Sequence, residues 1–237
     1  LFRSPFGAVK EQASGLYAQT LAERGFVTLA FDPSYTGESS GEPRNIASPD
    51  INTEDFMAAV DFMGLQPYVD RERIGVIGIC GMGGIALNAV AVDKRVKAVV
   101  ASTMYDMSRV MSKGYNDSVT PEQREQALEK MSLQRWEDAA NGKPAYQPAY
   151  NKLKGGEAQF LVDYADYYMT KRGYHPRAVN SGNSWSVTTP MAFMNFPLMT
   201  YIKEISPRPI LFIHGEKAHS LYFSKTAYEA ANQPKDR

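Results

Sequence analysis

Residues 74–84 read Ile74-Gly-Val-Ile-Gly-Ile-Cys80-Gly-Met-Gly-Gly84, and this stretch predicts a buried strand that turns sharply into a helix. The apolar run up to Gly78 is typical of a parallel strand, and the apolar residues from Gly83 to Val92 predict a helix packed on it. Cys80 is therefore expected in the turn between the two elements. A turn of this kind presents one nucleophilic side chain above the sheet and leaves the next backbone N–H free.

Cys80 is the predicted nucleophile, and the Gly81 N–H is the predicted donor to an oxyanion. A thiol at the amino end of a helix feels the positive end of the helix dipole, which favours the reactive thiolate. The alternative is a small buried cysteine that only packs under the turn. The spacing differs from the usual Gly-x-Ser-x-Gly motif, because Met82 stands where that motif has its second glycine.

The motif Gly78-Ile-Cys-Gly-Met-Gly-Gly84 resembles the nucleophile turn of dienelactone-hydrolase-like members of the α/β-hydrolase superfamily, in the branch with uncharacterised bacterial hydrolases and fungal polyketide transferases. Three more stretches carry the resemblance: Ser4-Pro-Phe-Gly-Ala-Val-Lys-Glu-Gln12, Phe31-Asp-Pro-Ser-Tyr-Thr-Gly-Glu-Ser39 and Pro209-Ile-Leu-Phe-Ile-His-Gly-Glu-Lys217. The resemblance implies an α/β-hydrolase fold, with a mostly parallel sheet flanked by helices. It also implies that residues 4–12 form an oxyanion loop, in which Phe6 or Gly7 supplies the second backbone donor.

Composition indicates an ordinary soluble globular protein of one domain, since 43% of the 237 residues are hydrophobic and 22% are charged. Lys+Arg and Asp+Glu both number 26, so no net field favours nucleic acid or a membrane surface as a partner. A single cysteine fits a reducing cytoplasm, and no signal peptide or membrane-spanning run is recognised. No cofactor and no metal are expected, and the sequence does not indicate an oligomeric state.

Strands and helices are expected to alternate, which predicts a parallel sheet covered on both faces. The strands are expected at residues 26–31, 74–79, 96–102 and 209–214, and the helices at residues 11–24, from 53 onward, 83–92 and 221–231. Thr53 is the predicted cap of the second helix, whose Phe56, Val60 and Met63 share one face. Leu16 and Leu21 are expected to point inward from the first helix.

The alternation stops between residues 107 and 205, which we expect to form a helical cap over an active-site mouth. A capping box with Pro121, at Thr120–Gln123, predicts a long helix to about Ala140. A second helix is expected at residues 157–172, followed by an irregular aromatic-rich stretch at 174–199. Residues 1–106 and 206–237 are then the hydrolase core.

The triad acid is predicted to be Asp106, with Glu216 as the alternative. The resembling hydrolases carry an aspartate at the position of Ala218 here, so another carboxylate must replace it. Asp106 is preferred because it follows the strand beside that of Cys80 and faces the same crevice.

None of the three histidines is the predicted base. His175 and His214 are expected to be structural, and His219 is expected nearer the site, in the neighbourhood of the acid. In the resembling enzymes a further strand follows the last helix, and the catalytic base lies in the loop after it. In the same enzymes the strand before the oxyanion loop lies between the strand of Phe31 and the strand of Cys80. We therefore expect an unpaired gap in the centre of this sheet. We also expect that the missing strands and the catalytic base lie outside residues 1–237.

The predicted reaction is attack of Cys80 on the ester, thioester or lactone carbonyl of a small-molecule acyl substrate. Hydrolysis and transfer to an alcohol or amine both remain open. The alternative is a non-catalytic ligand-binding or interaction protein on the same scaffold. Lys10 and Glu11 are interpreted either as a clamp for a substrate carboxylate or as an ordinary solvated ion pair.

Overall fold

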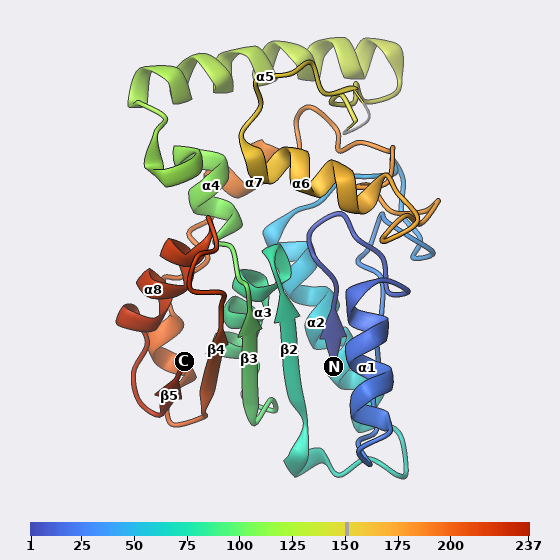
Figure 1. Cartoon of the computed structure of the whole chain (residues 1–237), viewed down its shortest axis with the longest axis vertical. Helices are drawn as coiled ribbons and strands as arrows, with labels where there is room; N and C mark the ends of the chain where they lie inside the picture. Colours follow the sequence, from blue (N-terminus) through green and yellow to red (C-terminus); the bar gives the residue numbers. More distant parts are fainter. Residues whose placement is uncertain (150–151) are drawn as a thin grey trace.

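The computed structural model describes residues 1–149 and 152–237, so Tyr150 and Asn151 of the expected cap lie outside the described residues. Five parallel strands form one sheet in the order β1-β2-β3-β4-β5 (Figure 1). Their bounds are Phe2–Arg3 for β1, Gly75–Ile79 for β2, Ala98–Ser102 for β3, Ile210–Ile213 for β4 and Lys235–Asp236 for β5. The predicted parallel sheet is confirmed.

The α-helices alternate with the strands at both ends of the described sequence. Their bounds are Ala13–Ala22 (α1), Pro49–Gly64 (α2), Gly81–Val92 (α3), Met107–Lys113 (α4), Pro121–Asn141 (α5), Gln159–Tyr168 (α6), Pro190–Met194 (α7) and Leu221–Ala230 (α8). Figure 1 shows α2 and α3 behind the sheet and α1 in front of it.

The predicted gap in the sheet is wrong, because β1 fills it. Phe2 is in register with Ile77 of β2 on one side and forms a parallel bridge with Ala30 on the other. The predicted strand order is thus confirmed, but the strand at residues 26–31 is reduced to this single bridge. A strand also follows α8, since β5 pairs with β4, and the expectation that none would follow is wrong as well.

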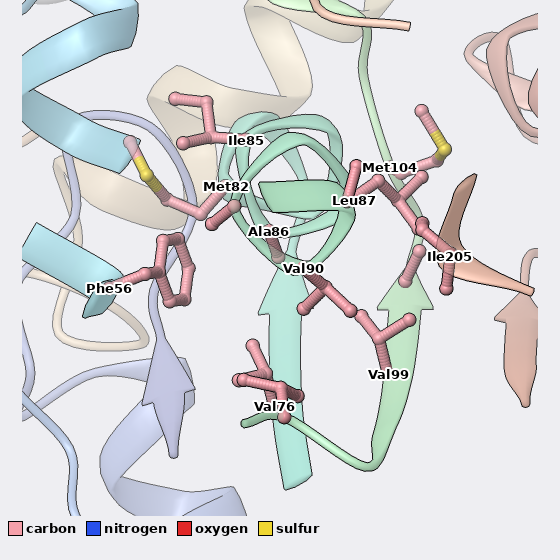
Figure 2. Close-up of a cluster of buried hydrophobic side chains, with 14 of the residues drawn as sticks. Phe56, Val76, Met82, Ile85, Ala86, Leu87, Val90, Val99, Met104 and Ile205 are labelled. Carbon is pink, nitrogen blue, oxygen red and sulfur yellow. The ribbon is translucent and has the colours of Figure 1, made fainter. Parts of the chain in front are cut away.

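The core is built around α3, whose side chains fill the space between the sheet and α2 (Figure 2). Ile85, Leu87 and Val90 are completely buried. The opposite face of the sheet is less covered than predicted: Leu211 and Ile213 of β4 are 38% and 46% exposed. The alternation of side chains along a strand puts these two residues on the face away from α3.

Two helices begin or orient differently from the sequence-based predictions. The helix α2 starts at Pro49 after Ser48, one turn before the expected cap Thr53, whose hydroxyl instead donates to the Pro49 carbonyl at 2.7 Å. In α1, Leu16 is 66% exposed and the small residues Ser14 and Ala18 face the core. A close approach of α1 to the oxyanion loop leaves room there only for small side chains.

The inserted segment, residues 107–205, contains the expected long helix. The capping box at Thr120 is confirmed, and α5 ends at Gly142 in the left-handed conformation. Figure 1 shows α4, α6 and α7 above the carboxyl ends of the strands, with α5 farther out. The last part of the segment, with Phe193, Leu198 and Ile205, belongs to the buried core cluster. Among the described residues, no helix is long and apolar enough to cross a membrane.

Candidate active site

Cys80 lies in a strained turn at the carboxyl end of β2. Its backbone has φ +55° and ψ −126°, a conformation that non-glycine residues rarely adopt. The turn is tight because α3 starts at once and packs back on the strand: a Cβ on Gly78 would lie 2.5 Å from the Met82 carbonyl oxygen. Such strain is typical of a nucleophile held in place by its surroundings.

The unusual glycine spacing follows from the packing of the next loop. A Cβ on Gly83 would lie 2.7 Å from the Met104 Cβ, and one on Gly84 would collide with the Tyr105 carbonyl oxygen. Glycine is therefore required one step later than in the usual motif. The Met82 side chain points into the core, where 1% of it is exposed, so that position has room for a long side chain (Figure 2).

The two predicted oxyanion donors converge on Cys80, the predicted nucleophile. The backbone N–H groups of Gly81 and Phe6 both hydrogen-bond to the Cys80 sulfur. A Cβ on Gly81 would lie 2.7 Å from the Phe6 Cβ, so glycine at position 81 allows the oxyanion loop to approach the start of α3. The structure therefore brings Cys80, Gly81 and Phe6 together. The other predicted donor, Gly7, has its carbonyl bonded to Asn180 and lies one residue further on.

The expected low thiol pKa is wrong. Burial raises the pKa of the Cys80 thiol to about 11, and the hydrogen bonds from Gly81 and Phe6 lower it by less. Although Cys80 as a whole is half-buried, its sulfur is desolvated, and desolvation of the thiolate outweighs the helix dipole. Cys80 is therefore a neutral thiol at neutral pH, and a nucleophilic role for it would require a base.

The raised thiol pKa predicts slow alkylation at neutral pH. Iodoacetamide should label Cys80 at pH 7.5 about 10²-fold more slowly than a free cysteine, because only the thiolate reacts. The rate should still rise between pH 9 and 10, since the folded thiol titrates above an ordinary one. Peptide mapping over a pH series checks this, and a midpoint at or below an ordinary thiol's ~8.5 would instead support an activated thiolate.

The two candidate acids lie in different environments. Asp106 is the N-cap of α4, and its carboxylate accepts the Arg109 N–H at 3.0 Å. Burial raises the pKa of the Asp106 carboxyl above its ordinary value, and the bond from Arg109 opposes this. Asp106 also adjoins the turn, because its neighbour Tyr105 donates its N–H to the Cys80 carbonyl at 3.0 Å. Glu216 is exposed and takes part in none of the ion pairs found among the described residues.

Within residues 1–149 and 152–237, none of the three histidines hydrogen-bonds to Cys80 or Asp106. The imidazole of His219 instead bonds to the Tyr105 hydroxyl and stacks on Phe160, with ring centroids 4.4 Å apart. Burial lowers the pKa of His219, which keeps the ring neutral. His214 bonds to the hydroxyls of Ser220 and Ser224. His175 accepts the Arg177 N–H at 3.4 Å.

Lys10 is not available as a clamp for a substrate carboxylate. Its ammonium group pairs with Glu11 at 3.0 Å and with the buried Asp32 at 3.2 Å, and Glu38 is a third partner. Burial lowers the pKa of Lys10, but the hydrogen bonds to Glu38, Glu11 and Asp32 raise it overall. The cation therefore holds the oxyanion loop to the loop after residue 31.

Two residues of the inserted segment contact the oxyanion loop, and of these sequence reasoning missed Asn180. Trp185 stacks on the Phe6 ring with centroids 4.3 Å apart, and Asn180 hydrogen-bonds to the Phe6 and Gly7 carbonyls. The only signal for Asn180 is its position in the stretch Ala178-Val-Asn-Ser181, an apolar and small run that is buried throughout. The described residues contain no cluster of three or more potential metal ligands.

Comparison with known proteins gives a consistent result. The family model described as the prolyl oligopeptidase family matches residues 12–152, more than half of the chain. An uncharacterised protein of Pseudomonas aeruginosa is 80% identical over 232 residues, which are 98% of this chain. The chain spans 62% of the length of that protein. A crystal structure of the Pseudomonas protein matches with a TM-score of 0.97 at 79% identity, over 99% of this chain and 73% of that one.

Two fungal relatives carry names that describe an activity. A thiohydrolase of Aspergillus aculeatus is 26% identical, over 86% of this chain and 64% of its own length. A polyketide transferase of a Penicillium species is 27% identical, over 91% of this chain and 69% of its own length. A Penicillium α/β hydrolase of known structure matches with a TM-score of 0.79 at 26% identity, over 99% of this chain and 78% of that one.

Proposed function

Because the chain belongs to the prolyl oligopeptidase family within the α/β-hydrolase superfamily, we propose that it cleaves or transfers an acyl group through a covalent intermediate on Cys80. The α/β-hydrolase fold predicted from residues 74–84 is shared with the Penicillium hydrolase. The observation that carries the proposal is the convergence of the Gly81 and Phe6 N–H groups on the Cys80 sulfur. Two backbone donors at a strained turn serve the oxyanion of an acyl-transfer intermediate.

In the proposed reaction, a general base takes the proton of the Cys80 thiol while the sulfur attacks the carbonyl carbon. The electron pair of the C=O bond moves to the oxygen, which then accepts hydrogen bonds from Gly81 and Phe6. The tetrahedral intermediate collapses and expels a thiolate or alkoxide, which takes the proton. Water then attacks the acyl-enzyme in hydrolysis, and an alcohol or amine attacks it in transfer. That the base lies outside the given residues stays a prediction.

The proposed substrates are small-molecule thioesters, with esters and lactones as the wider class. The names of the fungal thiohydrolase and polyketide transferase support this choice. The aromatic rings of Phe6 and Trp185, stacked next to the oxyanion donor, give an apolar surface suited to an acyl chain. We further propose that residues 107–205 act as a cap that covers this surface.

A trapped acyl-enzyme tests the proposal. The full-length protein, incubated with the hexanoyl thioester of N-acetylcysteamine, should release the free thiol and gain one hexanoyl group on the peptide that contains Cys80. Protein first alkylated at Cys80 is the control and should do neither. Thiol release from the alkylated control, or a hexanoyl group on another residue, would overturn the assignment.

A non-catalytic ligand-binding role is the second candidate, favoured by the neutral Cys80 thiol and by the lack of an imidazole contact to it among the described residues. In this case the same thioester would bind without releasing thiol. Saturable binding measured by calorimetry, with no acylated peptide, would support binding over catalysis.

A further inference from the structure

The oxyanion loop is held by a segment that lies far from it in the sequence. Residues 173–183 of the inserted segment lie against residues 4–12. The two are joined through the side chains of Gln12, Arg177 and Asn180. In Figure 1, the orange chain after α6 passes near the blue loop that leaves β1. The inserted segment therefore contacts the loop that carries a proposed catalytic donor.

Asn180 makes the most direct of these contacts. Its side-chain Nδ2 donates to the Phe6 carbonyl at 3.0 Å, and its backbone N–H donates to the Gly7 carbonyl at 3.1 Å. The residue is 6% exposed, so these hydrogen bonds are shielded from water. Asn180 therefore binds the carbonyl groups of two consecutive residues, Phe6 and Gly7, which follow the Phe6 N–H in the chain.

The oxyanion loop leaves space for the Asn180 side chain at Gly7. Gly7 has φ +87°, and a Cβ at this position would collide with the side-chain amide of Asn180. On the other side of Phe6, the Ala8 N–H donates to the Pro5 carbonyl at 2.8 Å, which orients the Pro5–Phe6 peptide. The peptide that contains the N–H aimed at Cys80 is thus restrained at its Pro5 carbonyl, and Asn180 restrains the next peptide at the Phe6 carbonyl, so the alignment of the N–H depends on both bonds.

We propose that Asn180 is a positioning residue that aims the Phe6 N–H at the oxyanion, and so couples the inserted segment to the reaction centre. This inference rests on the proposed acyl-transfer function. Without the Nδ2 donor, the peptide after Phe6 can rotate, and the Phe6 N–H then loses its alignment with the carbonyl oxygen. Trp185, stacked on the Phe6 ring, holds the side chain but not the peptide.

The kinetic test uses Asn180→Ala and Asn180→Asp with the hexanoyl thioester of N-acetylcysteamine. Both variants should lower kcat by about 10–100-fold with little change in KM, because the oxyanion forms only after binding. Asn180→Asp keeps the side-chain volume but exchanges the donor for a carboxylate, whereas Asn180→Ala removes the donor without adding a charge, so equal losses in the two variants assign the effect to the lost contact and not to the new charge. Binding of 1,1,1-trifluoroheptan-2-one, which forms an oxyanion on the thiol, should weaken by the same factor as kcat/KM. Binding of heptan-2-one, which keeps its carbonyl, should not change.

The matched control is Asn183→Ala. Asn183 donates to the Pro176 and Ala178 carbonyls within the same segment, and among the described residues it has no hydrogen bond to the oxyanion loop. It should keep kcat within about twofold of the wild type, since it affects only the packing of residues 173–183. Equal losses in the two alanine variants would show a general packing effect and would overturn the positioning role.

A second readout does not depend on turnover. The Phe6 N–H lowers the Cys80 pKa, so its misalignment in the uncharged variant Asn180→Ala should move the alkylation profile of Cys80 upward by about half a unit. Asn183→Ala should leave the profile in place. An unchanged profile together with unchanged trifluoroketone binding would refute the inference. A shifted profile in a protein that never turns over thioesters would refute the acyl-transfer function and leave the positioning role standing.

Discussion

Replacing Cys80 with alanine is expected to lower kcat for a small thioester by about 10⁴–10⁶-fold, the loss typical of a removed nucleophile. The Gly81 and Phe6 donors remain in place in this variant, so a small residual rate above the uncatalysed reaction should persist. KM should change little, because the thiol contributes to the transition state more than to substrate binding. Thiol release by the full-length protein, followed with a chromogenic disulfide, measures the effect.

Cys80→Ser is the informative companion to the alanine variant. A hydroxyl fits the same strained turn and can still be activated by a base, so an intermediate rate is expected. Thermal melts of both variants should resemble that of the wild type, since neither removes a core side chain. A kcat for Cys80→Ala within tenfold of the wild type would contradict the nucleophile assignment and favour the ligand-binding alternative.

The nucleophile turn could be predicted because its causes are local in the sequence. Glycines 78, 81, 83 and 84 and an apolar run on each side were enough to place Cys80 between β2 and α3. The same reasoning found the α5 capping box, in which the side chains involved are three residues apart. Strand order came from the resemblance, and the bridge from Phe2 to Ala30 bears it out.

The chemistry of the site could not be predicted in the same way. The thiol pKa depends on how far the folded chain desolvates the sulfur, which the sequence does not reveal, and this desolvation outweighs the helix dipole, which the sequence does predict. Asn180 was missed because its partner Phe6 lies 174 residues away and no periodic pattern links them. The gap at the sheet centre was predicted because residues 1–3 are too few to be recognised as a complete strand. In the structure, the two residues of β1 are enough to pair with the backbone groups of β2.

The residues after β4 show why position in the sequence alone does not decide between the two candidate acids. The resemblance placed an acid near residue 218, and Glu216 was the nearest carboxylate in sequence. In the structure that carboxylate is exposed, whereas Asp106 lies in the loop that packs on Gly84 and the nucleophile turn. Spatial position after a neighbouring strand therefore favours Asp106 as the proposed acid.

Asp106→Asn is expected to lower kcat by about 10⁴-fold, the effect of neutralising a triad carboxylate, while Glu216→Gln should stay within about twofold of the wild type. Asparagine is as good an N-cap as aspartate, so its side-chain oxygen can still accept the Arg109 N–H and α4 should keep its start. The loss would then come from the missing charge, not from a frayed helix, and thermal melts of both variants check this point. Without the carboxylate, the base loses the group that orients it and stabilises its protonated form. Were Glu216→Gln the damaging change and Asp106→Asn nearly silent, the acid would be reassigned to the loop after β4, and Asp106 would be left with the capping of α4 alone.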